Sequence, residues 1–168
     1  TPFKPNQSID HQALAAIVEF NISNGVDYLV ICGTTGESVT ITPTEKKEIA
    51  QTVINTSRGR VPLVIGIGGN NTVAVVDELQ STDLSPFAAI LSVAPYYSKP
   101  TQEGFYLHFK AVAEASTIPV ILYNVPGRTA KNVEASTVLR LANDFKSIVA
   151  VKEAGNNMEQ YLELIKHK

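Results

Sequence analysis

Short runs of apolar residues alternate along the whole sequence with segments of helical periodicity. Buried strands are short and almost continuously apolar, whereas surface helices repeat their apolar positions every three or four residues. On this basis the sequence predicts strands over residues 26–32, 61–67, 87–93, 119–123 and 147–152. It predicts helices over residues 10–23, 42–57, 72–81, 101–115 and 133–142, and another from about residue 157.

Capping residues mark several of these helix boundaries. Asp10, Thr101 and Asn132 are candidate N-caps, and Asn24-Gly25 is a helix stop. The segment Thr42-Pro43-Thr44-Glu45 combines an N-cap, a proline at the first helical position and a glutamate that completes a capping box. These signals support the helical segments independently of their periodicity.

The strand–loop–helix unit repeats at a spacing of roughly 30 residues, which requires parallel strands joined by crossover helices. An open doubly wound sheet and a β/α barrel both accept this repeat. The turns that lead into strands are short, whereas the loops that follow strands carry the threonine, tyrosine, arginine and lysine candidates. A barrel draws its site from the ends of several strands, so we expect one α/β domain over residues 1–168 with the barrel architecture.

Composition narrows the function classes. The 168 residues are 44% hydrophobic and 18% charged, with a formal net charge of -2 and no clustered run of Lys and Arg, which argues against nucleic-acid binding. No apolar run approaches membrane-spanning length, and no signal peptide opens the sequence. The single cysteine, Cys32, cannot form an internal disulfide. We therefore expect a cytoplasmic protein with no membrane partner.

Several common sites are disfavoured. Gly66-Ile67-Gly68-Gly69-Asn70-Asn71 begins like a dinucleotide-binding fingerprint, but asparagine stands at the third glycine position. His11, His108 and His167 fall on predicted helices without metal-ligand spacing, so we expect surface groups and no metal site. We interpret Cys32 as a packed strand residue, because no histidine is obviously placed to activate it as a nucleophile.

The segment Ser147–Gly155 contains an apolar run that ends on Lys152. A strand of this kind is expected to be buried on both faces, which would deliver its last residue to a poorly solvated rim of the core. Partial burial or a cationic neighbour favours the neutral amine of a lysine, which is a nucleophile. The alternative from this segment alone is a lysine that extends from a strand end into solvent.

Four motifs resemble, in order and spacing, those of the dihydrodipicolinate synthases, which belong to the pyruvate-dependent class I aldolase superfamily together with N-acetylneuraminate lyase. They are Gly33–Ser38, Pro95-Tyr96-Tyr97, Tyr123–Thr129 and Val151–Ala154. The resemblance implies a (β/α)8 TIM barrel in which a lysine on the sixth strand forms a Schiff base with pyruvate, without another cofactor. It also implies that this sequence covers about strands 2–6 as an incomplete barrel, truncated at both ends and part of a longer protein.

The resemblance assigns catalytic and substrate-binding roles by position. Lys152 would be the Schiff-base residue and Tyr123 the proton donor and acceptor. Thr34 would link Tyr123 to Tyr97, and Thr35 would hold the pyruvate carboxylate. In the family, the tyrosine matching Tyr97 enters the active site of a neighbouring subunit, and the resemblance implies a homotetramer built from tight dimers. Packing at the rim of the site is the alternative for Tyr97.

Arg128 separates family members, because its planar guanidinium suits a carboxylate such as that of aspartate semialdehyde. The expected reaction is therefore the condensation of pyruvate with L-aspartate 4-semialdehyde to 4-hydroxy-tetrahydrodipicolinate, in lysine and diaminopimelate biosynthesis. A structural loop arginine remains the alternative for this residue. The alternative function is another Schiff-base lyase, either N-acetylneuraminate lyase or a 2-keto-3-deoxy sugar-acid aldolase.

A regulatory pocket for lysine is implied in part. Three residues match the pocket of lysine-inhibited members, namely Ser38, Asn70 and Tyr96. Three other aligned positions, where those members use residues that include a histidine and a glutamate, hold Pro43, Lys46 and Ala74. We therefore expect weak or absent inhibition by lysine.

Overall fold

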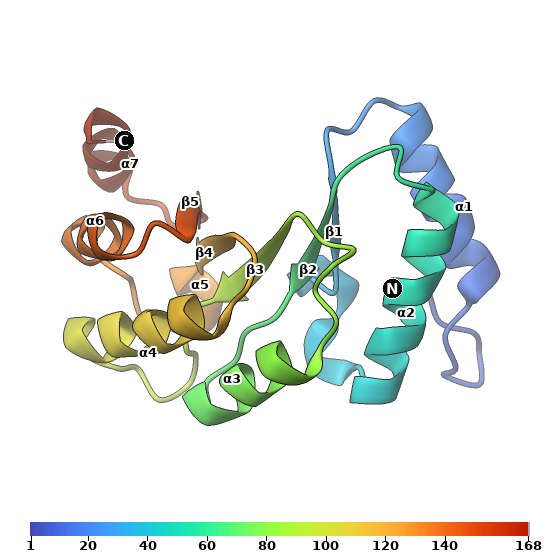
Figure 1. Cartoon of the computed structure of the whole chain (residues 1–168), viewed down its shortest axis with the longest axis horizontal. Helices are drawn as coiled ribbons and strands as arrows, with labels where there is room; N and C mark the ends of the chain where they lie inside the picture. The colour runs from blue at the N-terminus through green and yellow to red at the C-terminus, as the bar shows by residue number, and fades with distance from the viewer. Residues whose placement is uncertain (168) are drawn as a thin grey trace. The chain divides into compact units, whose positions relative to one another are not determined.

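The computed structural model describes residues 1–167, which alternate strands and helices (Figure 1). In chain order the elements are α1 (His11–Ser23), β1 (Leu29–Ile31), the 3-10 turns η1 (Thr34–Gly36) and η2 (Ser38–Thr40), α2 (Pro43–Ser57), β2 (Leu63–Gly66), α3 (Thr72–Ser81), β3 (Ala89–Val93), α4 (Gln102–Ala115), β4 (Val120–Asn124), α5 (Pro126–Thr129), α6 (Ala135–Asp144), β5 (Ile148–Glu153) and α7 (Met158–Lys166). Two compact units result, which are described separately. The first unit comprises Thr1–Gly66 with Ser85–Ala89, and the second runs from Ile67 to Leu84 and from Ile90 onward.

Strand pairing is parallel in both units. In the first unit β1 pairs with β2, with Leu29 opposite Leu63. In the second unit β3 pairs with β4, and β4 pairs with β5. Neighbouring strands are therefore consecutive in the chain, as crossover helices require and as the repeat predicts.

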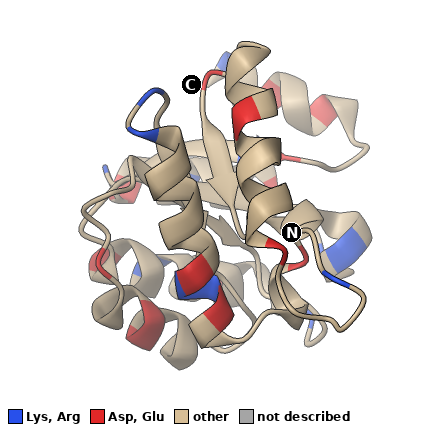
Figure 2. Cartoon of the chain, turned by 90° about the vertical axis from the view of Figure 1, so that its right-hand side faces the viewer, with Lys and Arg blue, Asp and Glu red and all other residues tan. Residues whose placement is uncertain are grey.

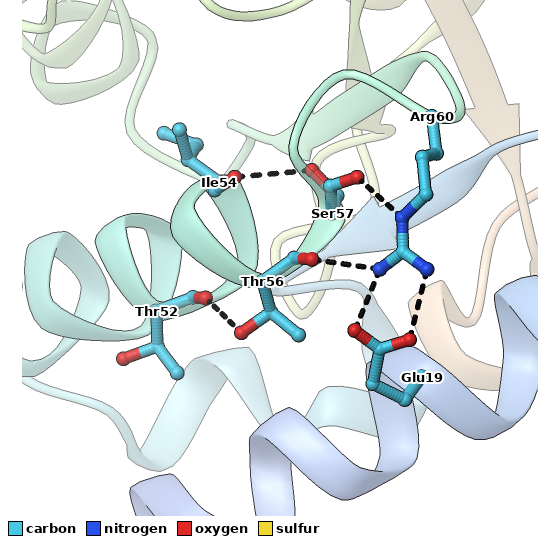
Figure 3. A network of polar contacts seen from close by, with 6 residues as sticks. All are labelled: Glu19, Thr52, Ile54, Thr56, Ser57 and Arg60. Carbon is cyan, nitrogen blue, oxygen red and sulfur yellow. Dashed lines mark hydrogen bonds and ion pairs between the residues drawn. The ribbon is translucent and has the colours of Figure 1, made fainter.

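The first unit packs α1 against α2, which lie side by side in Figure 1. Asp10 caps α1, and the predicted capping box of α2 is present in full. Arg60, which follows α2, makes a two-pronged ion pair with Glu19 of α1, with N–O distances of 2.6 and 2.9 Å (Figure 3). The same guanidinium donates to the carbonyl oxygens of Thr56 and Ser57, so one side chain ties the end of α2 to α1. The hydrogen bond from Arg60 lowers the pKa of the Glu19 carboxyl.

The core of the second unit is dominated by α4. Phe105, Phe109 and Val112 lie at intervals of three and four residues, and all three are fully buried. They are accompanied by Val120 and other fully buried apolar residues of the strands and of α6, such as Leu122 and Leu141. This packing fixes the positions of β4 and β5, whose ends carry the candidate site.

His108 corrects one of our predictions. We expected a surface histidine, but the side chain is only 3% exposed and lies on the buried side of α4. Its Nδ1 is 2.8 Å from the Thr72 hydroxyl, and its Nε2 has no hydrogen-bond partner among the described residues. The helical periodicity was read from aliphatic and aromatic residues, so a histidine on the same face was missed.

Several predicted boundaries were wrong. Strands β1, β2 and β3 are shorter than predicted, and β1 stops at Ile31 because Cys32 has a φ of 54°. Residues 126–129, predicted as loop, form the short helix α5. Helix α6 begins at Ala135 after Glu134, and the side chain of Asn132 does not cap it but bonds to Asn124 and Gln160.

Three further observations concern function classes. No helix within residues 1–167 is long and apolar enough to cross a membrane. The same residues contain no group of three or more His, Cys, Asp or Glu side chains that could hold a metal ion. Figure 2 shows basic and acidic segments interspersed along the helices, so neither sign dominates the ribbon seen in that view.

Candidate active site at the ends of β4 and β5

The ends of β4 and β5 bring Tyr123 and Lys152 together. The two residues are directly opposite each other in the parallel register. The Lys152 Nζ lies 4.3 Å from the centroid of the Tyr123 ring, a cation–π geometry. Tyr123 is 6% exposed and so has a fixed position, whereas Lys152 remains exposed. An amine and a phenol are thus held side by side at the carboxyl end of the sheet.

The surroundings of Lys152 differ from our expectation. We predicted a strand buried on both faces, but Val149, Ala150 and Lys152 are exposed. Among the described residues, β5 has a strand neighbour only in β4, so one of its edges lacks a covering strand. The prediction of a poorly solvated lysine is therefore wrong for the chain as described.

Arg128 follows β4 in the short helix α5, which starts at Pro126. Its backbone N–H donates to the Val125 carbonyl at 2.8 Å, and its side chain is exposed. The buried neighbour Thr129 donates its hydroxyl to the Lys131 carbonyl at 2.9 Å. The helix therefore anchors the backbone of this segment and leaves the guanidinium in solvent.

The tyrosine pair follows β3 in the same unit. Tyr97 is 88% exposed and has a φ of 70°, an uncommon backbone conformation for a residue with a side chain. Its side chain is therefore not packed against the buried Tyr123. Tyr96 is half-buried, and Asn70, in the loop before α3, is exposed.

The remaining predicted residues lie in the first unit. Thr34 and Thr35 form η1, whose carbonyl at residue 34 accepts the Glu37 N–H at 3.1 Å. Glu37 has a φ of 59° and joins η1 to η2, which starts at Ser38. Lys46 of α2 donates its Nζ to the Gly66 carbonyl at 2.6 Å, at the end of β2.

Sequence reasoning missed a polar cluster next to Lys152. The Glu153 carboxylate accepts hydrogen bonds from the side chains of Asn124 and Gln160 and from the Gly155 N–H, and Asn132 bonds to both amides. We call these five residues the Glu153 network. A cavity of about 390 Å³ adjoins it, lined by four of its members together with Pro126 and residues 156–157. The available signal was the polar residue that follows Tyr123 and Lys152 on each strand, Asn124 and Glu153.

Comparisons with known proteins identify the family of the chain. The model of the dihydrodipicolinate synthetase family matches residues 1–168. The chain belongs to this family. The family resemblance inferred from the sequence is thereby confirmed, because the match spans every motif on which the resemblance was based.

Individual relatives support the assignment to the dihydrodipicolinate synthetase family. A 4-hydroxy-tetrahydrodipicolinate synthase of Flavobacterium psychrophilum is 58% identical over 168 residues, which are 100% of this chain and 57% of the relative. The crystal structure of a dihydrodipicolinate synthase from Aquifex aeolicus superposes with a TM-score of 0.93 at 40% identity, covering 99% of this chain and 57% of that one. The chloride-inhibited dihydrodipicolinate synthase of Acinetobacter baumannii complexed with pyruvate gives 0.93 at 37% identity, with the same coverage.

These superpositions confirm the predicted fold class, an α/β chain that corresponds to part of the TIM barrel of the dihydrodipicolinate synthetase family. The chain spans about 57% of the length of the curated relatives that it matches. The assignment to a single domain and the roles of the individual site residues stay predictions.

Proposed function

We propose that the protein containing this chain condenses pyruvate with L-aspartate 4-semialdehyde to form 4-hydroxy-tetrahydrodipicolinate. The observation that carries the proposal is the position of the Lys152 amine, 4.3 Å from the ring centre of Tyr123 at the ends of two paired strands. A nucleophilic amine beside a phenol is the minimum needed for Schiff-base chemistry with proton transfer. Membership of the dihydrodipicolinate synthetase family supports the same reaction.

In the proposed mechanism the neutral amine of Lys152 attacks the ketone carbon of pyruvate. The resulting carbinolamine loses water to give an iminium, and Tyr123 supplies and removes protons in these steps. The iminium withdraws electrons, so the methyl carbon loses a proton and becomes an enamine nucleophile. That carbon forms the new bond to the aldehyde carbon of the semialdehyde, whose oxygen becomes the hydroxyl group of the product. The amino group of the former semialdehyde then attacks the iminium carbon, closes the ring and expels the Lys152 amine, which gives 4-hydroxy-tetrahydrodipicolinate. No metal or other cofactor takes part in this proposal.

The other predicted residues complete the proposed site. Thr35 would hold the pyruvate carboxylate, and Thr34 would relay protons between Tyr123 and Tyr97. The exposed guanidinium of Arg128 would bind the carboxylate of the second substrate through two parallel hydrogen bonds. The 88% exposed Tyr97, which follows β3, is consistent with a residue that contacts another subunit, so we propose a homotetramer built from dimers. We also propose that this homotetramer is cytoplasmic.

Borohydride trapping tests the nucleophile and the first substrate together. Full-length protein treated with pyruvate and sodium borohydride is expected to gain one reduced pyruvate, mapped by peptide mass spectrometry to Lys152. Lys152→Arg should abolish the adduct, and Lys146→Arg, at an exposed lysine before the same strand, should retain it. Tyr123→Phe keeps the ring beneath Nζ but removes the hydroxyl, and should slow turnover by about 10²–10⁴-fold. An adduct on another lysine would reject the proposal.

Regulation by lysine is proposed to be weak. The ammonium group of Lys46 donates to the Gly66 carbonyl. Ala74 has no carboxylate that could bind the ammonium group of a ligand. The three aligned positions, Pro43, Lys46 and Ala74, therefore supply neither the histidine nor the glutamate that lysine-inhibited members use. We expect millimolar lysine to reduce the initial rate of condensation less than about twofold, a small effect beside the coupling typical of allosteric effectors. Strong inhibition in that range would contradict this expectation.

A further inference from the structure

Glu153 and Asn124 occupy the rung next to the Lys152–Tyr123 pair. The register pairs Tyr123 with Lys152 and Asn124 with Glu153. Because successive side chains of a strand point to opposite faces, the amine and the phenol share one face and the amide and the carboxylate share the other. The second pair is therefore a side-chain clamp behind the candidate active site.

The Glu153 carboxylate is bound by neutral donors from three segments. Asn124 Nδ2 lies 2.8 and 3.1 Å from its two oxygens, Gln160 Nε2 lies 2.7 Å from Oε2, and the Gly155 N–H lies 2.8 Å from Oε1. A Cβ atom at position 155 would stand 2.9 Å from Oε1, so glycine permits this close approach. An ionised carboxylate only accepts hydrogen bonds, which matches a site surrounded by donors.

The donors are themselves held in place. Asn124 is fully buried, and its Oδ1 accepts the Val133 N–H at 3.0 Å. Gln160 is 8% exposed, its Oε1 accepts from Asn132 Nδ2 at 2.8 Å, and its Nε2 also lies 3.2 Å from the Val133 carbonyl. Both amides bond to backbone groups of Val133, whose N–H can only donate and whose carbonyl can only accept, so their orientation is fixed. The network joins β4, β5, α7 and the segment before α6 at one point.

We propose that Glu153 is a positioning residue that fixes the end of β5, and with it the Lys152 amine, against Tyr123. It touches neither substrate nor reacting atoms in this proposal and acts through the backbone of the adjacent residue. The catalytic consequence rests on the proposed Schiff-base function, whereas the effect on the position of Lys152 does not. A displacement of the amine by about 1 Å is enough to reduce a rate by about 10²-fold in well-ordered sites.

Two variants of Glu153 and a matched control separate positioning from general stability. Glu153→Gln keeps the size but turns an amide NH₂ group toward donors, so not all of the hydrogen bonds can form. Glu153→Asp keeps the charge and withdraws the carboxylate from Asn124 and Gln160. Glu163→Gln makes the same charge change at an exposed position of α7 and serves as the control.

Two readouts are measured in full-length protein, after a thermal melt has established that each variant is folded. The first is the rate at which acetic anhydride labels Lys152, normalised to the exposed Lys146. The second is the steady-state condensation of pyruvate with the semialdehyde. We expect Glu153→Gln to raise relative labelling at least about threefold, as the amine leaves the ring of Tyr123, and to lower kcat about tenfold with the KM for pyruvate within about twofold. Glu153→Asp should be intermediate, and Glu163→Gln should match the wild type.

The outcomes distinguish this proposal from the proposed function. If labelling responds to Glu153→Gln but the wild type forms no pyruvate adduct, the positioning role stands and the Schiff-base function fails. If both readouts stay within about twofold of the wild type, an effect below about 0.4 kcal/mol, the positioning role is overturned. It is also overturned if both Glu153 variants fail to fold, because the residue is then needed for the fold and not for placing the amine.

Discussion

His108 lies inside the second unit as an imidazole with little contact to water. Burial lowers its pKa from 6.5 to about 4. The protonated ring carries a positive charge and an N–H on both nitrogens, and its Nε2 has no hydrogen-bond partner among the described residues. The neutral form is therefore the one that fits beside Thr72.

Stability is predicted to depend on pH through His108. Between pH 6.5 and about 4 the unfolded chain binds a proton at this residue and the folded chain does not. The contribution to folding is therefore complete above pH 6.5 and is lost as the pH falls toward 4, by roughly 3 kcal/mol in total. Urea unfolding at several pH values should show that the unfolding free energy depends less steeply on pH in His108→Gln than in the wild type. An equal dependence on pH in the two proteins would contradict the assignment.

The side chains of the site show what a single sequence reveals at the residue scale. Lys152 was predicted as a candidate because it ends an apolar run, whereas Tyr123 was assigned through the family resemblance. Parallel pairing brings the two together. The contacts of Glu153 were not predicted, because its partners Asn124 and Gln160 lie 29 and 7 residues away. Which polar groups meet across such separations depends on strand register and helix packing, and neither is encoded locally.

Helix α2 is defined by its first turn as much as by its apolar face. The Thr42 hydroxyl accepts the Glu45 N–H at 3.3 Å, and the Glu45 carboxylate accepts the Thr42 N–H at 2.8 Å. The two bonds satisfy backbone N–H groups that have no partner inside the helix. The proline between them contributes a fixed φ at a position where no donor is lost.

Removal of this cap is predicted to destabilise the first unit. Thr42→Ala abolishes one of the reciprocal hydrogen bonds and should cost about 1 kcal/mol of unfolding free energy. Thr44→Ala, at an exposed threonine two residues further along, should change the unfolding free energy by less than about 0.5 kcal/mol. The midpoint of urea unfolding measures both, and an equal loss for the two variants would remove the cap from the explanation.

The predicted and observed N-caps show which helix boundaries are encoded by neighbouring residues. Thr42 and Thr101 cap their helices as predicted, since an N-cap bonds only to residues two or three positions ahead. Asn132 has the same side-chain chemistry but bonds to Asn124 and Gln160, and α6 starts later. Tertiary hydrogen bonds outcompeted a local cap there, and the sequence before the helix gives no sign of it.

At the scale of the whole molecule, the chain aligns with about 57% of the length of its curated relatives. The strands at both ends of its sheet order expose apolar side chains. Val30 of β1 is 42% exposed and Val149 of β5 is 59% exposed. Within residues 1–167, β1 pairs only with β2 and β5 only with β4. Strand edges with exposed apolar side chains are sites of association with further β-structure.

We expect Val149→Lys in β5 to have opposite effects in the isolated 168-residue chain and in the full-length protein. In the 168-residue chain expressed alone, Val149→Lys should reduce association measured by light scattering, because a charge on an exposed edge strand opposes edge-to-edge pairing. In the full-length protein the same change should lower the unfolding free energy by about 2 kcal/mol or more if further β-structure buries position 149. Leu107→Lys, at a 54% exposed position of α4, should leave association of the isolated chain unchanged, since a helix face offers no unpaired backbone. A full-length protein that tolerates Val149→Lys without loss of stability would mean that position 149 of β5 is open to solvent in the native molecule.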